Sequence, residues 1–146
     1  MIDEYGYVVN VDGVVVRDDE YLLIERAADV EHAAGMLGLP GGKLEDPPDD
    51  EDAIESTVVR ELDEEVGVEV GDVEYVHSTT FEADDGSPCL NIITRCAYRG
   101  GDARPNAPDE VSAVHWLSYE EINARDDVPP FTERYIDIVA SSKAER

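Results

Sequence analysis

The sequence has 146 residues, a length typical of one domain with a sizeable buried core. It carries 36 acidic residues against 11 lysines and arginines, which gives a formal net charge of −25. This charge argues against duplex nucleic acid as a partner, because no basic patch is present to replace its counterions. No segment is long and apolar enough to span a bilayer, and the N-terminus lacks a leader pattern. We therefore expect a cytoplasmic protein that does not contact membranes, with Cys89 and Cys96 reduced.

The first part of the chain predicts a β-hairpin followed by a glycine turn. Tyr5–Arg17 is rich in valine and alternates in hydropathy, and Tyr21–Arg26 is expected to be the returning strand. Ala27–Leu37 is expected to be a loop. Leu39–Gly42 is expected to be a tight turn, because its glycines allow backbone conformations closed to other residues.

A helix is predicted to begin near Asp52, where an acid is a reasonable N-cap, and to end at Gly67. Its buried stripe repeats every four residues, at Ile54, Val58, Leu62 and Val66.

The second half predicts three further strands and two helices. The expected strands are Val68–Phe81 with an interruption at Gly71 and Asp72, Cys89–Tyr98, and Val111–Leu117. Ser118 and Glu121 form a capping-box pattern for a short helix, and Thr132–Ser142 is expected to be a final amphipathic helix with Tyr135, Ile136 and Val139 inward. Residues 1–146 are therefore expected to form one α/β sandwich domain.

Glu61, Glu64 and Glu65 share one face of the predicted helix, since positions i, i+3 and i+4 are neighbours. Crowded carboxylates repel one another, and a divalent cation such as Mg²⁺ or Mn²⁺ would remove that penalty. In so acidic a chain the alternative is an ordinary solvated face.

The run from Arg60 to Val68 reads RELDEEVGV, and it follows the turn Gly41-Gly42-Lys43-Leu44-Glu45. This pattern resembles the Nudix box, in which a glycine, five residues, a glutamate and seven residues precede R-E-U-x-E-E-x-G-U, with U apolar. The second half of the box is met at every fixed position. The first half departs from it, because four additional residues separate Gly42 from Arg60, and the glutamate position of the box falls on Asp52.

The resemblance to the Nudix family implies an α/β/α sandwich with a mixed sheet, and hydrolysis of a nucleoside diphosphate linked to another group. It implies metal binding by Glu61, Glu64, Glu65, Glu110 and the carbonyl of Gly41. A catalytic base is expected among Glu61, Glu64 and Glu110. Arg60 is expected to pair with a carboxylate and, with Asp52, to have a structural role. A homodimer is a possible assembly by analogy.

Further segments, including Arg26–Asp29 and Asn123–Pro130, resemble MutT-type nucleotide pyrophosphohydrolases. That resemblance implies that Arg26 and Lys43 face substrate phosphates. It aligns Thr132 with an asparagine that reads oxidised guanine, but one hydroxyl cannot pair bidentately with a base as an amide does, which argues against strict 8-oxoguanine specificity. Phe131 is expected either to stack on the base or to anchor the helix. Trp116 is expected in the core.

The preferred interpretation is a metal-dependent hydrolase of a nucleoside di- or triphosphate derivative. A second interpretation keeps the box and changes the substrate to ADP-ribose, a nucleotide sugar or a dinucleotide. A third is a non-catalytic nucleotide-binding module. The composition is also similar to that of proteins from cells that accumulate molar salt, so we expect folding to need high salt, which screens self-repulsion.

Overall fold

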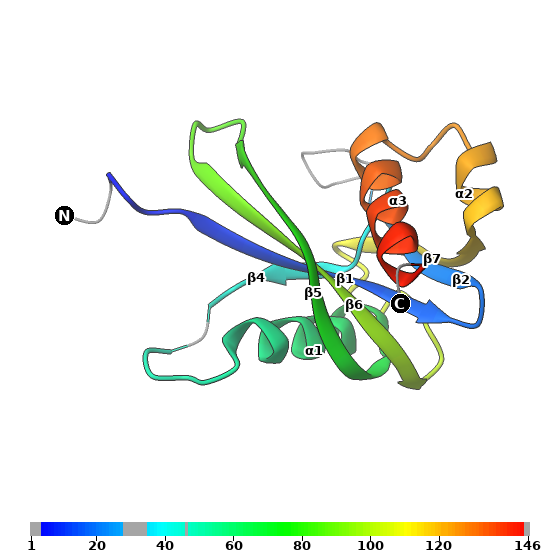
Figure 1. Ribbon diagram of the computed structural model, residues 1–146, viewed down its shortest axis with the longest axis horizontal. Coiled ribbons are helices and arrows are strands. Elements are labelled where there is room, and N and C mark those ends of the chain that lie inside the picture. Colours follow the sequence, from blue (N-terminus) through cyan, green and yellow to red (C-terminus); the bar gives the residue numbers. More distant parts are fainter. Residues whose placement is uncertain (1–3, 28–34, 46, 145–146) are drawn as a thin grey trace.

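The computed structural model describes residues 4–27, 35–45 and 47–144. Within them, a seven-stranded mixed sheet lies between helices on its two faces (Figure 1). In chain order the elements are β1 (Val8–Arg17), β2 (Glu20–Arg26), β3 (Leu37–Gly38), β4 (Gly41–Lys43), α1 (Ala53–Val66), β5 (Glu69–Glu82), β6 (Pro88–Gly100), β7 (Val111–Ser118), α2 (Tyr119–Ala124) and α3 (Pro130–Ala144). None of the helices in these ranges is both long and apolar enough to cross a membrane.

Strand β1 changes its pairing partner along its length, from β4 in its first half to β2 at its end. The strands run in the order β3-β2-β1-β6-β5, with β7 paired to β2. The β1–β6 pair is parallel, and the other strand pairs are antiparallel. β1 is in register with β2 only at Val16 and Arg17, whereas Asn10, Val11 and Asp12 pair with β4. The first half of β1 therefore lies beside β4 instead of β2.

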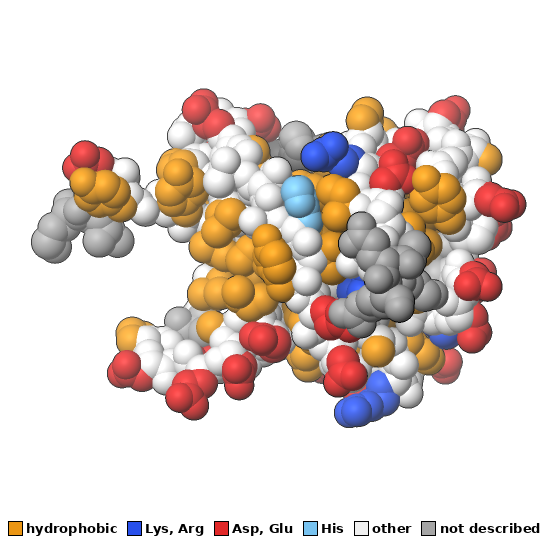
Figure 2. All heavy atoms as spheres, in the orientation of Figure 1, with side chains coloured by type: hydrophobic (Ala, Val, Ile, Leu, Met, Phe, Trp, Pro, Cys, Tyr) orange, Lys and Arg blue, Asp and Glu red, His pale blue; other side chains and the backbone are white. Residues whose placement is uncertain are grey.

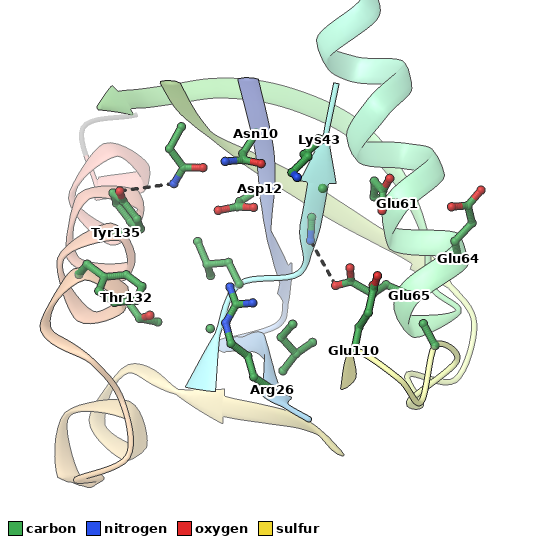
Figure 3. Close-up of a pocket in the computed structure, with 18 of the residues that line it drawn as sticks. Asn10, Asp12, Arg26, Lys43, Glu61, Glu64, Glu65, Glu110, Thr132 and Tyr135 are labelled. Atoms are coloured by element: carbon green, nitrogen blue, oxygen red, sulfur yellow. Dashed lines mark hydrogen bonds between the residues drawn. The ribbon is translucent and has the colours of Figure 1, made fainter. Parts of the chain in front are cut away.

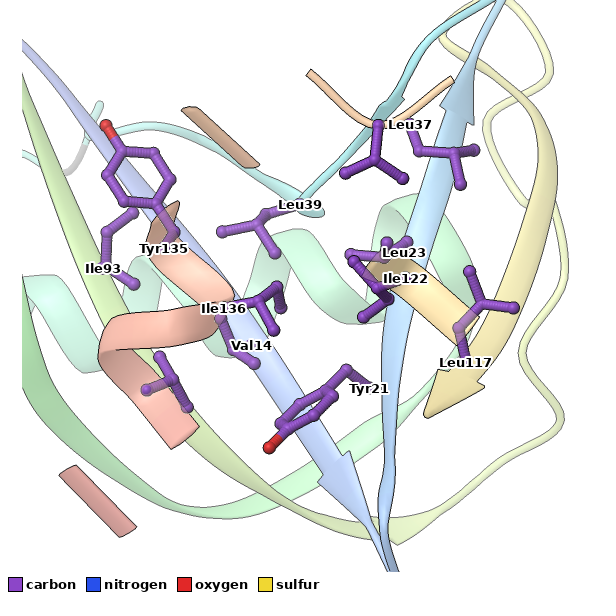
Figure 4. Close-up of a cluster of buried hydrophobic side chains, with 12 residues drawn as sticks. Val14, Tyr21, Leu23, Leu37, Leu39, Ile93, Leu117, Ile122, Tyr135 and Ile136 are labelled. Carbon is purple, nitrogen blue, oxygen red and sulfur yellow. The ribbon is translucent and has the colours of Figure 1, made fainter. Parts of the chain in front are cut away.

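Two hydrophobic clusters cover the two faces of the sheet. On one face Val58, Leu62 and Val66 of α1 are fully buried against a cluster that includes Val11 and Val15 of β1. On the other face α2 and α3 pack against Val14, Leu23 and Ile93, contributing Ile122, Tyr135, Ile136 and Val139 (Figure 4). Alternate residues of β1 thus enter opposite clusters, as the period of a strand requires. The predicted α/β/α sandwich with a mixed sheet is confirmed.

Helix α1 follows the sequence prediction at its core and C-terminus. Gly67 adopts the left-handed conformation and its N–H donates to the Asp63 carbonyl at 3.1 Å. The helix also begins where predicted, at Ala53, but without the expected side-chain cap. Asp52 is the N-cap residue, but it has φ 53° and ψ 42°, and its side chain makes no capping hydrogen bond. A capping side chain normally requires an extended backbone, so the left-handed conformation of Asp52 removes that role.

The glycine-turn prediction at Leu39–Gly42 was incomplete, because Gly41–Lys43 forms β4 against β1. The predicted loop Ala27–Leu37 lies mostly outside the described residues, but its last residue begins β3, which pairs with Ile24 and Glu25 of β2. At Gly71 and Asp72 the strand β5 continues through a register shift between Val70 and Val73.

The capping box of Ser118 and Glu121 is present at the start of α2. The last helix, α3, begins at Pro130, two residues earlier than predicted. Proline is well suited to the first turn of a helix, where its missing N–H costs nothing.

Candidate active site

A cavity of about 1080 Å³ lies between α1 and α3, beside the part of β1 that pairs with β4 (Figure 3). Its lining comes from both sides of the sandwich. From α1 and the loop before β7 come Glu61, Glu64, Glu65, Asp109 and Glu110; from β1, β2, β4 and β6 come Asn10, Asp12, Arg26, Lys43 and Asn91; from α3 come Phe131, Thr132 and Tyr135. The cavity therefore has an acidic wall on α1 and a mostly uncharged wall on α3.

Glu61, Glu64, Glu65 and Glu110 form the acidic wall. Glu65 is buried, and its Oε1 accepts a hydrogen bond from the Gly41 N–H at 3.4 Å. Burial raises the pKa of Glu65 to about 8, and the charges of Glu110, Glu61 and Asp12 act in the same direction. Burial, followed by the charge of Glu64, also raises the pKa of Glu61. The acidic wall therefore carries more negative charge than the nearby cationic side chains and hydrogen-bond donors compensate.

The two glycines of β4 allow carboxylates to approach the strand closely. A methyl group at Gly41 would collide with Oδ1 of Asp12 and with the carbonyl oxygen of Val11. A methyl group at Gly42 would collide with the carboxyl group of Glu61. Gly41 and Gly42 thus bring Asp12 and Glu61 against the same short strand, where side chains would hold them apart.

The loop that carries Glu110 is fastened to the C-terminal end of α1. Asn106 donates from Nδ2 to the carbonyl oxygens of Asp63 at 3.3 Å and Glu64 at 3.2 Å, and its N–H donates to the Glu65 carbonyl at 3.0 Å. These carbonyls are among the last of the helix, which have no partner within it. The Glu110 carbonyl in turn accepts from the Ala27 N–H at 3.0 Å. The position of Glu110 is therefore coupled to that of the glutamates on α1.

The structure brings all four predicted substrate residues to the same cavity. Arg26, Lys43 and Phe131 line it, and Phe131 is 46% exposed. Thr132 also lines it, but this side chain is 1% exposed and its hydroxyl donates to the Leu37 carbonyl at 3.2 Å. The proton of that hydroxyl is therefore engaged within the protein, and only its oxygen could accept a bond from a ligand.

Three residues with a role predicted from the sequence do not line the cavity: Arg60, Asp52 and Trp116. The Nη2 atom of Arg60 lies 3.5 Å from Oε1 of Glu61. Arg60 therefore pairs with one residue of the acidic wall from outside the cavity. Asp52 does not line the cavity, whereas Glu45 of the glycine turn does. Trp116 packs against the α1-side cluster, with the Arg17 guanidinium 3.9 Å above its ring. Trp116 is only partly buried, so the core placement predicted for it is met in part.

Sequence reasoning missed the polar residues on the floor of the cavity. Asn10 and Asp12 interrupt the apolar run of β1 at two-residue spacing, which places them on one face of the strand. That interruption was the signal available in the sequence. Asn91 gave no comparable signal, because it reaches the site through the parallel pairing of β6 with β1. Tyr135 was predicted in the core, where it is, but it also lines the cavity.

The NUDIX domain family model matches residues 6–137, which is most of the chain. The chain belongs to the Nudix family. It is 37% identical over 119 residues to a MutT-like protein of Streptomyces ambofaciens, a match that covers 80% of this chain and 68% of that protein. It is 31% identical over 125 residues to the 8-oxo-dGTP diphosphatase of Escherichia coli, covering 85% of this chain and 89% of that protein.

Solved structures show the same fold. The MutT NUDIX hydrolase from Burkholderia pseudomallei superimposes with a TM-score of 0.76 at 25% identity, and the match covers 92% of this chain and 98% of that one. The family, these relatives and this structure identify the chain as a Nudix hydrolase, with the Nudix fold predicted from the sequence.

Nudix hydrolases generally use divalent metal ions, and the donor chemistry of the acidic wall suits them. Carboxylate oxygens and a backbone carbonyl are the ligands that Mg²⁺ prefers. Glu61 and Glu110 act on the buried carboxylate of Glu65, and Glu64 acts on Glu61, which leaves a charge that a cation would balance. Across the described ranges, however, no three His, Cys, Asp or Glu side chains are gathered tightly enough to hold one ion. Metal binding would have to draw the glutamates together.

Proposed function

We propose that this Nudix hydrolase cleaves the pyrophosphate linkage of a nucleoside di- or triphosphate derivative, with Mg²⁺ or Mn²⁺ bound at the acidic wall. One observation carries the proposal: Glu61, Glu64, Glu65 and Glu110 face one cavity that also contains two cationic side chains, Arg26 and Lys43. Acids alone would repel a diphosphate, so the arrangement is useful only when bound cations reverse the local field.

The metal ligands in this proposal are Glu61, Glu64, Glu65, Glu110 and the Gly41 carbonyl. When bound, the metal would neutralise phosphate oxygens and favour attack by water. Glu65 is suited to binding a cation, because its buried carboxylate is costly to ionise without one and the Gly41 N–H holds it in place. Arg60 supports Glu61 from outside the cavity.

For the catalytic base we favour Glu110 over Glu61 and Glu64. Glu110 is exposed at the cavity, and its backbone is fixed by hydrogen bonds from its own N–H to Ala107 and from Ala27 to its carbonyl. A general base needs access to water and a fixed position. Glu61 and Glu64 lie on the helix itself, and they remain the alternatives.

Arg26 and Lys43 would contact the phosphates, and the nucleoside would extend toward α3. Phe131 is exposed at the rim, where a base could stack on it, and Thr132 offers one acceptor oxygen. The E. coli relative is an 8-oxo-dGTP diphosphatase. The limited hydrogen-bonding capacity of Thr132 argues against strict 8-oxoguanine specificity in this chain. ADP-ribose, a nucleotide sugar or a dinucleotide is the alternative substrate class.

The test is a nucleotide panel with metal titration in molar KCl. Pyrophosphate and nucleoside monophosphate should appear from a triphosphate only when Mg²⁺ or Mn²⁺ is present. Production of AMP from ADP-ribose, with triphosphates intact, would favour the alternative substrates. Absence of turnover across the panel, together with nucleotide binding by calorimetry, would instead identify a binding module.

We also propose that the enzyme works in the cytoplasm and forms a homodimer. Two buried free cysteines, Cys89 and Cys96, suit the reducing cytoplasm. A homodimer, by analogy with related domains, would be detected by sedimentation as twice the mass of one chain. A single-chain mass at working concentration would remove that part of the proposal.

A further inference from the structure

Asp12 lies on the floor of the cavity, on the α3 side of β1. Residues 10, 12 and 14 of the strand face the same way, and Val14 belongs to the α3-side cluster. Asn91 of β6 is level with Asn10, and its neighbour Ile93, two residues on, belongs to the same cluster. Figure 3 shows Asp12 between the glutamates of α1 and the side chains of Thr132 and Tyr135.

In the part of the chain that the structure describes, the side-chain hydrogen bond to the Asp12 carboxyl group comes from Asn91. Burial raises the pKa of Asp12 to about 7; the Asn91 amide and the charge of Arg26 oppose this effect. The Asn91 amide also donates to the Tyr135 hydroxyl at 3.4 Å. Asp12, Asn91 and Tyr135 therefore form a connected polar group in the cavity. A partly buried carboxylate with so few donors gains free energy from a ligand that supplies more.

The surroundings define the kind of ligand that Asp12 suits. A phosphate is unsuitable, because two anions would face each other. Phe81 and Phe131 are each 46% exposed and line the same cavity, so a flat ring has aromatic faces to contact. A carboxylate has two acceptor oxygens, which fit two neighbouring N–H groups on the edge of such a ring. Guanine presents this pair, N1–H and the 2-amino group, whereas adenine places an acceptor nitrogen beside its amino group.

We propose that Asp12, oriented by Asn91, is a specificity-determining residue that accepts hydrogen bonds from the N1–H and 2-amino group of a guanine-type base. The proposal deepens the nucleotide hydrolysis proposed above and rests on it. It places the base against β1 and β6, so selection would depend on the floor of the cavity more than on Thr132.

The experiments below also distinguish two other roles that Asp12 could have. The charge of Asp12 reaches Glu65, so it could assist the metal site. It could also accept from the hydroxyl groups of a ribose. The base is favoured because Asp12 shares its face of the sheet with Asn10 and Asn91, and because two aromatic side chains flank the cavity.

The first test uses the unaltered protein and compares dGTP with dITP, which lacks only the 2-amino group. We expect kcat/KM to be about tenfold to a hundredfold higher for dGTP, the range for losing a hydrogen bond to a charged acceptor. GTP should be used about as well as dGTP. Equal efficiencies for dGTP and dITP would overturn the proposal, whatever any variant does.

The second test repeats the comparison with Asp12→Asn. The amide keeps the size of the side chain but replaces one acceptor oxygen by a donor, so the preference for dGTP over dITP should fall to near one. Asp19→Asn, in the exposed turn after β1, is the matched control and should keep the preference. Thermal unfolding of both variants verifies that they are folded.

The outcomes separate this proposal from the function on which it rests. Metal-dependent turnover of nucleotides without base discrimination would leave the proposed function and remove the role of Asp12. An Asp12→Asn protein that keeps the dGTP preference but needs more Mg²⁺ would assign Asp12 to the metal site. A preference for GTP over dGTP in the unaltered protein that disappears in Asp12→Asn would overturn the proposal and assign Asp12 to the sugar. If no nucleotide is hydrolysed or bound, both proposals fail.

Discussion

The backbone N–H of Gly41 donates to Oε1 of Glu65 at 3.4 Å, which joins β4 to α1 at the centre of the acidic wall. Among the described residues, this is the one hydrogen bond to the carboxylate of Glu65, a residue that is only 6% exposed. Since burial and neighbouring acids all disfavour its ionised form, Glu65 is the point at which a bound cation would change the protein most.

Without metal, stability should fall as pH rises between about 5 and about 8. Glu65 ionises near its ordinary value of 4.5 when unfolded but near pH 8 when folded, so the native state holds more protons over this window. Unfolding free energy therefore decreases with pH there. Chemical denaturation in EDTA, at fixed high salt, measures it. Glu65→Gln should flatten the dependence, and an unchanged slope in this variant would contradict the assignment.

Glu64→Gln should lower metal-dependent turnover by about two orders of magnitude or more, as losses of electrostatic stabilisation do. It should leave folding intact, because removing one of several crowded acids eases repulsion. Glu55→Gln, on the exposed part of the first turn of α1, is the control and should keep full activity. Near-normal turnover in both Glu64→Gln and Glu65→Gln would remove these residues from the metal site.

Gly42→Ala should impair activity through Glu61. The added methyl group has no room beside that carboxyl group, so Glu61 must move away from β4. We expect a higher Mg²⁺ requirement and a lower kcat, measured by metal titration. Gly100→Ala is the control, because the methyl group would enter open space. The same metal requirement in both variants would show that the close approach of Glu61 to Gly42 is unimportant.

Asn106→Ala should lower kcat more than it raises KM for the nucleotide. The variant loses the two side-chain hydrogen bonds to the end of α1, and with them part of the fastening of the Glu110 loop. Stability should fall by only about 1 kcal/mol, the usual contribution of such bonds. Steady-state kinetics and thermal unfolding give both quantities. A drop in stability with unchanged kcat would mean that the loop keeps its place without Asn106.

Salt should stabilise the fold strongly. Acidic side chains are spread around the outline of the molecule in Figure 2, and the net charge is −25. Raising KCl from about 50 mM to about 2 M shortens the Debye length to a few ångströms and screens this repulsion. The midpoint of thermal unfolding should rise steeply over that range. A midpoint that does not move would refute our expectation that folding needs high salt.

Local patterns predicted the parts of the fold that depend on neighbours in sequence. The four-residue repeat of Val58, Leu62 and Val66 was sufficient to orient α1, and the capping box of Ser118 was sufficient to start α2. The partner change of β1 was not predictable in this way. It depends on β4 and β6, which are far from β1 in sequence, and the glycines of β4 suggested a turn instead of a strand.

The acidic half of the site was predictable because a helix places i, i+3 and i+4 together, and because the resemblance to MutT-type pyrophosphohydrolases outside the Nudix box supplied Glu110. The floor of the cavity was not predictable, because Asp12 and Asn91 meet only through the parallel pairing of strands some 80 residues apart. The position of Asp52 at the start of α1 was predictable, but the absence of its side-chain cap was not, because a cap depends on backbone conformation.

The two walls of the cavity belong to opposite layers of the sandwich, and they meet only where β1 leaves β2. Replacements on α3 or on the floor could alter which molecule is accepted while the glutamates opposite stay untouched. An inherited reaction could in this way be redirected to new compounds by a few changes, and a protein engineer could follow the same route.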